Sequence, residues 1–79
     1  MASLPVCSGA DAIRAFERSG WLRASQKGSH VTMTKSGAVV VLTVPLHREL
    51  GPGLLRSLIR KAEMTVDEFV DLLKRKKAR

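Results

Sequence analysis

The first apolar residues of the chain recur with the spacing of an α-helix. Ser8 is a common N-cap residue type, and Asp11 stands in the first turn, near the positive end of the helix dipole. Gly20 is suited to the left-handed conformation that often ends a helix. The pattern therefore predicts a helix over residues 9–19. Its buried stripe is expected to consist of Ala12, Ile13, Ala15 and Phe16.

The period then changes from helical to two-residue alternation. Residues 21–26 are short and half polar and predict a first strand, and Lys27, Gly28 and Ser29 form a turn. Residues 30–34 alternate strictly between polar and apolar and predict a second strand with one solvated face. Ser36-Gly37 is typical of a hairpin, and the β-branched residues 38–44 predict a third strand.

A two-residue loop at Ser36-Gly37 fixes a register for this second hairpin. Met33 is expected opposite Val40, and Val31 opposite Leu42, so that one face of the sheet is apolar. A longer loop would change this register.

The same register predicts what the other face of the sheet carries. His30 is expected opposite Thr43, pointing away from the core. Val39 and Val41 are expected beside it, with no helix to cover them, which would mark an interface.

Two helices are predicted after the strands. Pro45 ends the third strand, and Gly51-Pro52-Gly53 precedes apolar residues at helical spacing over residues 54–62. Thr65 and Glu68 form a capping-box pair that begins a last helix. The order α-β-β-β-α-α predicts an α+β domain with the helices on one face of a three-stranded antiparallel sheet.

Length and composition indicate one small domain over residues 1–79. No apolar run approaches a membrane span, no signal peptide is expected, and the single cysteine, Cys7, is expected to be a small buried hydrophobic residue. These features predict a soluble, cytoplasmic protein.

Charge is distributed unevenly along the chain. The formal net charge is +7, and residues 74–79 carry five of the fourteen Lys and Arg residues, which predicts a solvated, disordered basic tail. No acidic residue lies between Arg18 and Glu49. A surface of one sign favours a polyanion, first nucleic acid and second an acidic protein. The basic residues of this central region are Arg23, Lys27, Lys35 and Arg48.

The sequence lacks the residue patterns that several common catalytic chemistries require. The central region lacks the carboxylates of a metal-dependent nuclease, no recognised zinc-ligand spacing occurs, and phosphate-binding glycine motifs are missing. No metal or cofactor is therefore expected.

Residues 27–30 are the remaining candidate site. Gly28 lets a ligand approach the backbone, Lys27 is a cation, Ser29 is a donor, and histidine is the side chain that titrates near neutral pH. RNA supplies its own nucleophile, the 2′-hydroxyl, so a positioned proton acceptor or donor can cleave it. A lone exposed histidine is nevertheless more often without a catalytic role. For His47 a structural or phosphate-contacting role is favoured.

Several short motifs, in this order and spacing, resemble the HicA toxin family of bacterial and archaeal toxin–antitoxin systems. The resemblance extends from about Leu4 to Phe69. Its motifs are Leu4-Pro5-Val6, Ser8-Gly9, Gly20-Trp21, residues 26–30 (QKGSH), residues 44–47 (VPLH) and residues 53–59 (GLLRSLI).

The resemblance implies a fold like the double-stranded-RNA-binding domain and an endoribonuclease that cleaves mRNA. It also implies a HicB-type antitoxin that masks the site, and it assigns the catalytic histidine to His30. The expected RNA-binding residues are Lys27, Gly28, Ser29, Arg23, Lys35, His47, Arg56 and Arg60.

Two other functions are compatible with the sequence. A non-catalytic double-stranded-RNA-binding module on the same fold would use basic residues of the penultimate helix, such as Arg56, Arg60 and Lys61. A protein-interaction domain would use the basic surface to dock an acidic partner.

Overall fold

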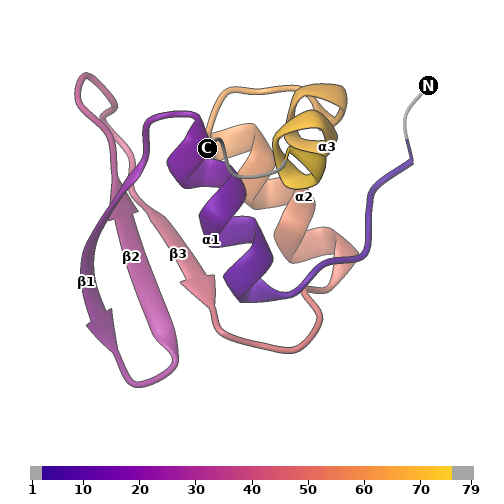
Figure 1. Cartoon of the computed structure of the whole chain (residues 1–79). Coiled ribbons are helices and arrows are strands. Elements are labelled where there is room, and N and C mark those ends of the chain that lie inside the picture. The colour runs from indigo at the N-terminus through magenta and orange to yellow at the C-terminus, as the bar shows by residue number, and fades with distance from the viewer. Residues whose placement is uncertain (1–2, 76–79) are drawn as a thin grey trace.

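A helix, three antiparallel strands and two helices follow one another in the computed structural model, which describes residues 3–75 (Figure 1). The strands form one sheet in the order β1-β2-β3, and the helices gather on one side of it. The predicted α+β order is thereby confirmed. No helix in residues 3–75 has the length and apolarity to cross a bilayer. The elements are α1 (Gly9–Arg18), β1 (Leu22–Lys27), β2 (His30–Thr34), β3 (Leu42–Pro45), α2 (Pro52–Lys61) and α3 (Val66–Lys74).

The helix ends follow the predicted local chemistry. At the start of α1, the backbone N–H of Asp11 donates to Ser8 Oγ over 3.0 Å. At the start of α3, Thr65 and Glu68 form the complete capping box. α3 includes Lys74, so the basic run begins within this helix, and residues 76–79 of the predicted tail lie outside the described residues.

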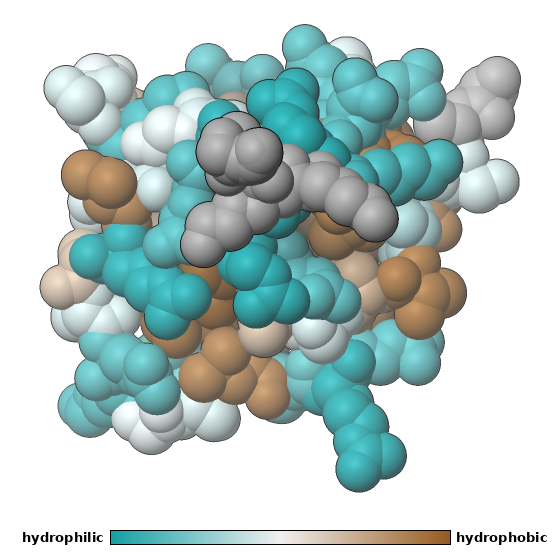
Figure 2. All heavy atoms as spheres, viewed as in Figure 1, coloured by the Kyte–Doolittle hydropathy of each residue, from teal (hydrophilic) through white to brown (hydrophobic). Residues whose placement is uncertain are grey.

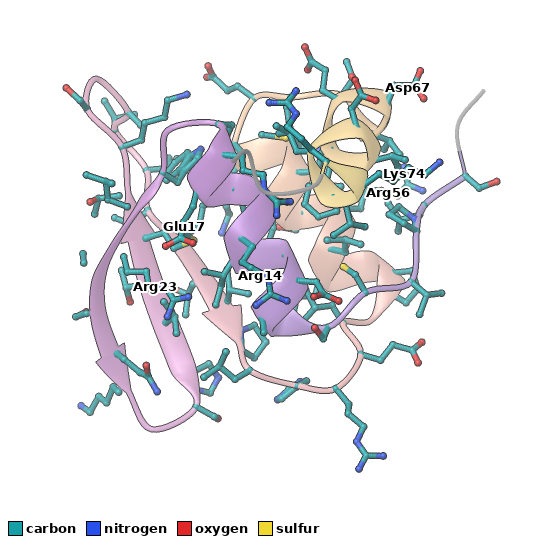
Figure 3. All side chains as sticks on the ribbon, in the orientation of Figure 1. Arg14, Glu17, Arg23, Arg56, Asp67 and Lys74 are labelled. Atoms are coloured by element: carbon teal, nitrogen blue, oxygen red, sulfur yellow. The ribbon has the colours of Figure 1, made fainter. Side chains whose placement is uncertain are left out.

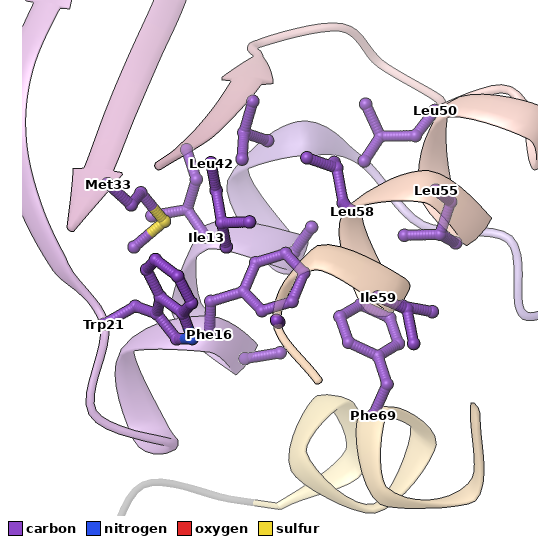
Figure 4. Close-up of a cluster of buried hydrophobic side chains, with 14 of the residues drawn as sticks. Ile13, Phe16, Trp21, Met33, Leu42, Leu50, Leu55, Leu58, Ile59 and Phe69 are labelled. Atoms are coloured by element: carbon purple, nitrogen blue, oxygen red, sulfur yellow. The ribbon is translucent and has the colours of Figure 1, made fainter. Parts of the chain in front are cut away.

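The face seen in Figure 1 carries mainly hydrophilic side chains, with hydrophobic ones in scattered patches (Figure 2). Beneath this surface, one hydrophobic cluster joins the sheet to all three helices (Figure 4). Phe16 of α1 packs on Phe69 of α3 with ring centroids 5.2 Å apart, and Trp21 is only 1% exposed. Cys7 belongs to this cluster, as predicted, and burial followed by the charge of Asp11 raises the pKa of its thiol. The sheet contributes Val31, Met33, Leu42 and Val44.

The predicted register of the β2–β3 hairpin is wrong by two residues. Met33 pairs with Leu42 and Val31 with Val44, and β3 begins at Leu42 instead of Ala38. The turn at Ser36-Gly37 does form, since Ala38 N donates to Lys35 O over 3.0 Å. Residues 39–41 then leave the ladder. Because the shift is even, the apolar face of the sheet is preserved.

The same shift removes two valines from the His30 face. His30 pairs with Pro45 instead of Thr43, and Val39 and Val41 lie in the connection before β3. The expectation that these valines flank His30 is therefore wrong. Contacts beyond the end of β3 account for the register, because the N–H of Leu46 donates to Ser29 O over 2.6 Å and extends the ladder past the strand.

Candidate functional site

A tight turn joins β1 to β2 and carries the predicted site residues at its tip. Gly28 adopts φ +60°, a conformation that glycine reaches without strain, and a Cβ built there would meet nothing within 4 Å. Gln26 Nε2 donates to the Gly28 carbonyl over 3.0 Å, which braces the turn. The backbone of this turn is therefore both held in shape and open to a ligand.

His30 lies on the side of the sheet away from the helices. The next residue, Val31, is 1% exposed in the core, so strand alternation turns His30 outward, where it is exposed. Lys27 pairs directly with His30 across the hairpin, and residues opposite one another in a ladder share a face. An imidazole and an ammonium group thus project from the same surface.

We call this surface the open face. Ser25 pairs with Thr32, and Thr32 pairs with Thr43, which gives a row of hydroxyl groups across all three strands, next to His30. None of the residues on this face is acidic. The residues of this face are Leu22, Ser25, Lys27, His30, Thr32, Thr34, Thr43 and the buried Pro45. The alternation of residues 30–34 and the predicted register already placed Thr32, Thr34 and Thr43 on this face, but Ser25 joins them only through the observed pairing of β1 with β2.

His47 is brought to the turn by the segment after β3. The bond from Leu46 N to Ser29 O continues the ladder, and the Gly9 N–H donates to the His47 carbonyl over 2.9 Å. His47 is exposed. The start of α1 and the turn therefore hold this segment between them, and the second histidine lies one residue beyond the contact with Ser29.

Arg23, in contrast, lies on the other side of the sheet. It pairs with Met33, whose side chain is buried, and a bulge separates it from Ser25. Its Nε donates to Glu17 Oε2 of α1 over 3.1 Å (Figure 3). Arg23 is thus occupied by an exposed ion pair away from the open face.

The remaining basic candidates lie far from His30. Lys35 follows the opposite end of β2, roughly 16 Å along the strand at ~3.3 Å per residue. Lys35 and Arg60 line a cavity at that end of the molecule. Arg56 is exposed on α2 among the helices (Figure 3). The structure therefore gathers Lys27, Gly28, Ser29 and His47 around His30, and does not bring Arg23, Lys35, Arg56 or Arg60 to it.

Metal-ligating residues are dispersed in the part of the chain that the structure describes. No three His, Cys, Asp or Glu side chains there come together in a way that would hold a metal ion. The chemistry available at the turn is that of an imidazole, an ammonium group, hydroxyl groups and open backbone.

The chain matches the model of a known protein family. The family model described as "HicA toxin of bacterial toxin-antitoxin" matches residues 9–64, which run from the start of α1 to just beyond α2 and include His30 and His47. A comparison with curated proteins gives no match. The matched range covers more than two thirds of the 79 residues. With the fold and the predicted motifs in agreement, the chain belongs to the HicA family of toxins of bacterial toxin–antitoxin systems.

Proposed function

We propose that this toxin is an endoribonuclease that cleaves mRNA without a metal ion and uses His30 as a general acid or base. The observation that carries the proposal is the exposed His30 beside Lys27, on a face without carboxylates and at an open glycine turn. Membership of a toxin family supports it, because destruction of mRNA arrests growth. Since mRNA is the substrate, the proposal places the activity in the cytoplasm.

The reaction proceeds through the hydroxyl group of the RNA itself. The 2′-oxygen loses its proton and attacks the adjacent phosphorus, and the bond from phosphorus to the 5′-oxygen breaks. That oxygen then takes up a proton. The products are a 2′,3′-cyclic phosphate and a 5′-hydroxyl group. A neutral His30 serves as the acceptor of the first proton, or a protonated His30 as the donor of the second.

The groups around His30 hold the phosphate during this reaction. The ammonium group of Lys27 offsets the negative charge that develops on the phosphate oxygens. Gly28 and Ser29 let the RNA backbone approach the turn, and His47 offers a further contact with a phosphate. Arg23, Lys35, Arg56 and Arg60 are left out of this site because the structure places them elsewhere.

A toxin of this family has an antitoxin partner. We propose that this partner is of the HicB type and that it covers the open face, which the helices of residues 3–75 leave uncovered. Covering this face would exclude RNA from His30.

Cleavage by the purified chain in excess EDTA tests the proposed activity. We expect a defined transcript of several hundred nucleotides to be shortened, with the same products after a fresh addition of EDTA, and expression without the antitoxin to arrest growth. Binding of the transcript without shortening would contradict the proposal. It would favour the binding module, for which Arg56 and Arg60 lie exposed one turn apart on α2.

A further inference from the structure

The loop before β3 exposes three consecutive valines. Residues 38–41, which we call the valine loop, were expected to form a strand but stand outside the sheet. Val39 is 99% exposed, Val40 40% and Val41 49%. Such a run of β-branched residues is typical of a strand, yet these three valines lie in an exposed loop.

The backbone of this loop is also unpaired. Among the hydrogen bonds of residues 3–75, only Ala38 of the loop takes part, through its N–H to Lys35 O. The N–H and C=O groups of Val39, Val40 and Val41 have no protein partner there. An extended segment with free backbone groups can pair with a strand of another protein, and its alternate side chains then contact that strand's neighbours.

A basic cavity lies against the valine loop. It has a volume of about 440 Å³ and separates the loop from the end of α2. Its walls include Lys35, Arg60 and Lys61, opposed by the one carboxylate of Glu63. The lining is therefore positive and suits a carboxylate-bearing ligand.

Trp21 lines the same cavity and lacks a hydrogen-bond partner. Its side chain is 1% exposed, and Nε1 is buried with no acceptor in the structure. A buried N–H without an acceptor is costly, and native proteins rarely leave one unpaired. Among the described residues, the buried side of this cavity is therefore where the core leaves a polar side-chain atom unpaired.

The exposed valines favour a peptide over the other ligands that this basic surface could bind. An RNA strand gains little from three exposed aliphatic side chains. A second copy of the chain would bring like charges together, and three of the last four residues are themselves basic. A peptide segment with alternating apolar and acidic side chains matches the valines, the free backbone and the cations at once.

We propose that the valine loop and the adjacent cavity dock an extended, acidic and apolar segment of the antitoxin. The segment pairs its backbone with Val39–Val41 and directs carboxylates toward Lys35, Arg60 and Lys61. This inference rests on membership of a toxin–antitoxin family and not on the proposed ribonuclease activity. It also places an antitoxin contact at the end of the sheet opposite His30.

Paired aspartate substitutions in the loop test the proposal. The antitoxin used is the one that neutralises this chain on co-expression, and its affinity is measured by titration calorimetry. Val39→Asp with Val41→Asp is expected to weaken binding at least tenfold while RNA cleavage stays at the wild-type rate. Val6→Asp is the matched control, since Val6 is 76% exposed elsewhere, and it should leave affinity unchanged.

Charge reversal on α2 provides an independent variant should the loop variant fail to fold. Arg60→Glu is expected to weaken antitoxin binding about tenfold, whereas Arg56→Glu, one turn away on the same helix and outside the cavity, should change it less than twofold. In the complex, the amides of Val39–Val41 should exchange with solvent at least tenfold more slowly.

Three outcomes would overturn the proposal. Unchanged affinity in the folded loop variant and in Arg60→Glu would show that the antitoxin docks elsewhere. Loss of RNA cleavage with unchanged antitoxin affinity would make the loop an RNA surface. A wild-type dimer in sedimentation that the loop variant abolishes, with antitoxin affinity unchanged, would make it a contact between copies of this chain.

Discussion

Replacing His30 by alanine is expected to lower the rate of RNA cleavage by about 10²–10⁴-fold, the usual cost of removing a positioned acid or base. Growth arrest on expression should disappear with it. The variant should remain folded, because His30 is exposed on the open face and its truncation leaves no cavity in the core. The measurement is the rate of transcript degradation in EDTA, with circular dichroism to confirm the fold.

His47→Ala is the matched control for this prediction. His47 is also exposed and lies at the same turn, but we assign it only a contact with phosphate. It should therefore reduce cleavage less than His30→Ala. A folded His30→Ala variant that cleaves RNA at the wild-type rate would contradict the catalytic assignment.

Replacing Gly9 by alanine is expected to destabilise the fold more than any exposed substitution discussed above. A Cβ at Gly9 would stand 1.9 Å from the carbonyl oxygen of Pro45, and backbone atoms cannot yield as a flexible side chain does. Overpacking of this kind costs about 3 kcal/mol at the upper end of its usual range. For a domain of this size, the Tm should fall by roughly 12–24 °C.

Gly53→Ala is the control for this second prediction. Gly53 lies in α2, a Cβ there meets nothing within 4 Å, and alanine is the better helix former, so stability should stay the same or rise slightly. Thermal unfolding followed by circular dichroism compares the two variants. Equal melting temperatures would show that the packing of α1 on Pro45 is not as tight as the structure has it.

Local signals explain why the helices and the faces of the sheet were predictable. Ser8, Thr65 and Glu68 begin their helices through contacts only three residues away, and the alternation of residues 30–34 separates the two faces without knowledge of the partner strand. The register of β3 depends instead on contacts between distant residues. The bonds from Leu46 to Ser29 and from Gly9 to His47 join segments that no local pattern connects.

Only part of the candidate site was likewise predictable from local sequence. Lys27, Gly28, Ser29 and His30 are consecutive, so sequence alone grouped them. His47 was also expected to contact RNA, but its position beside this turn follows from long-range contacts of the fold. The charge of a residue does not reveal which face of a strand its side chain occupies. Arg23 was therefore expected to bind RNA together with His30, whereas in the structure it forms an ion pair with Glu17 on the helical side of the sheet.

The two proposed contact surfaces, the open face and the valine loop, would have different roles in antitoxin binding. Covering the open face would exclude RNA from His30, while the valine loop at the opposite end of the sheet would hold the partner in place. Contacts at both ends would allow the antitoxin to bind tightly without relying on the polar open face alone.

The chemical identity of the RNA ends tests the central claim most directly. Fragments produced by the purified chain in EDTA should carry a 2′,3′-cyclic phosphate on one side of the cut and a 5′-hydroxyl group on the other, because the 2′-hydroxyl is the nucleophile. Mass spectrometry of a short cleaved oligonucleotide distinguishes these ends. Fragments with a 3′-hydroxyl and a 5′-phosphate would show that water attacks the phosphorus, and would contradict the proposed role of His30 and of the RNA's own hydroxyl group.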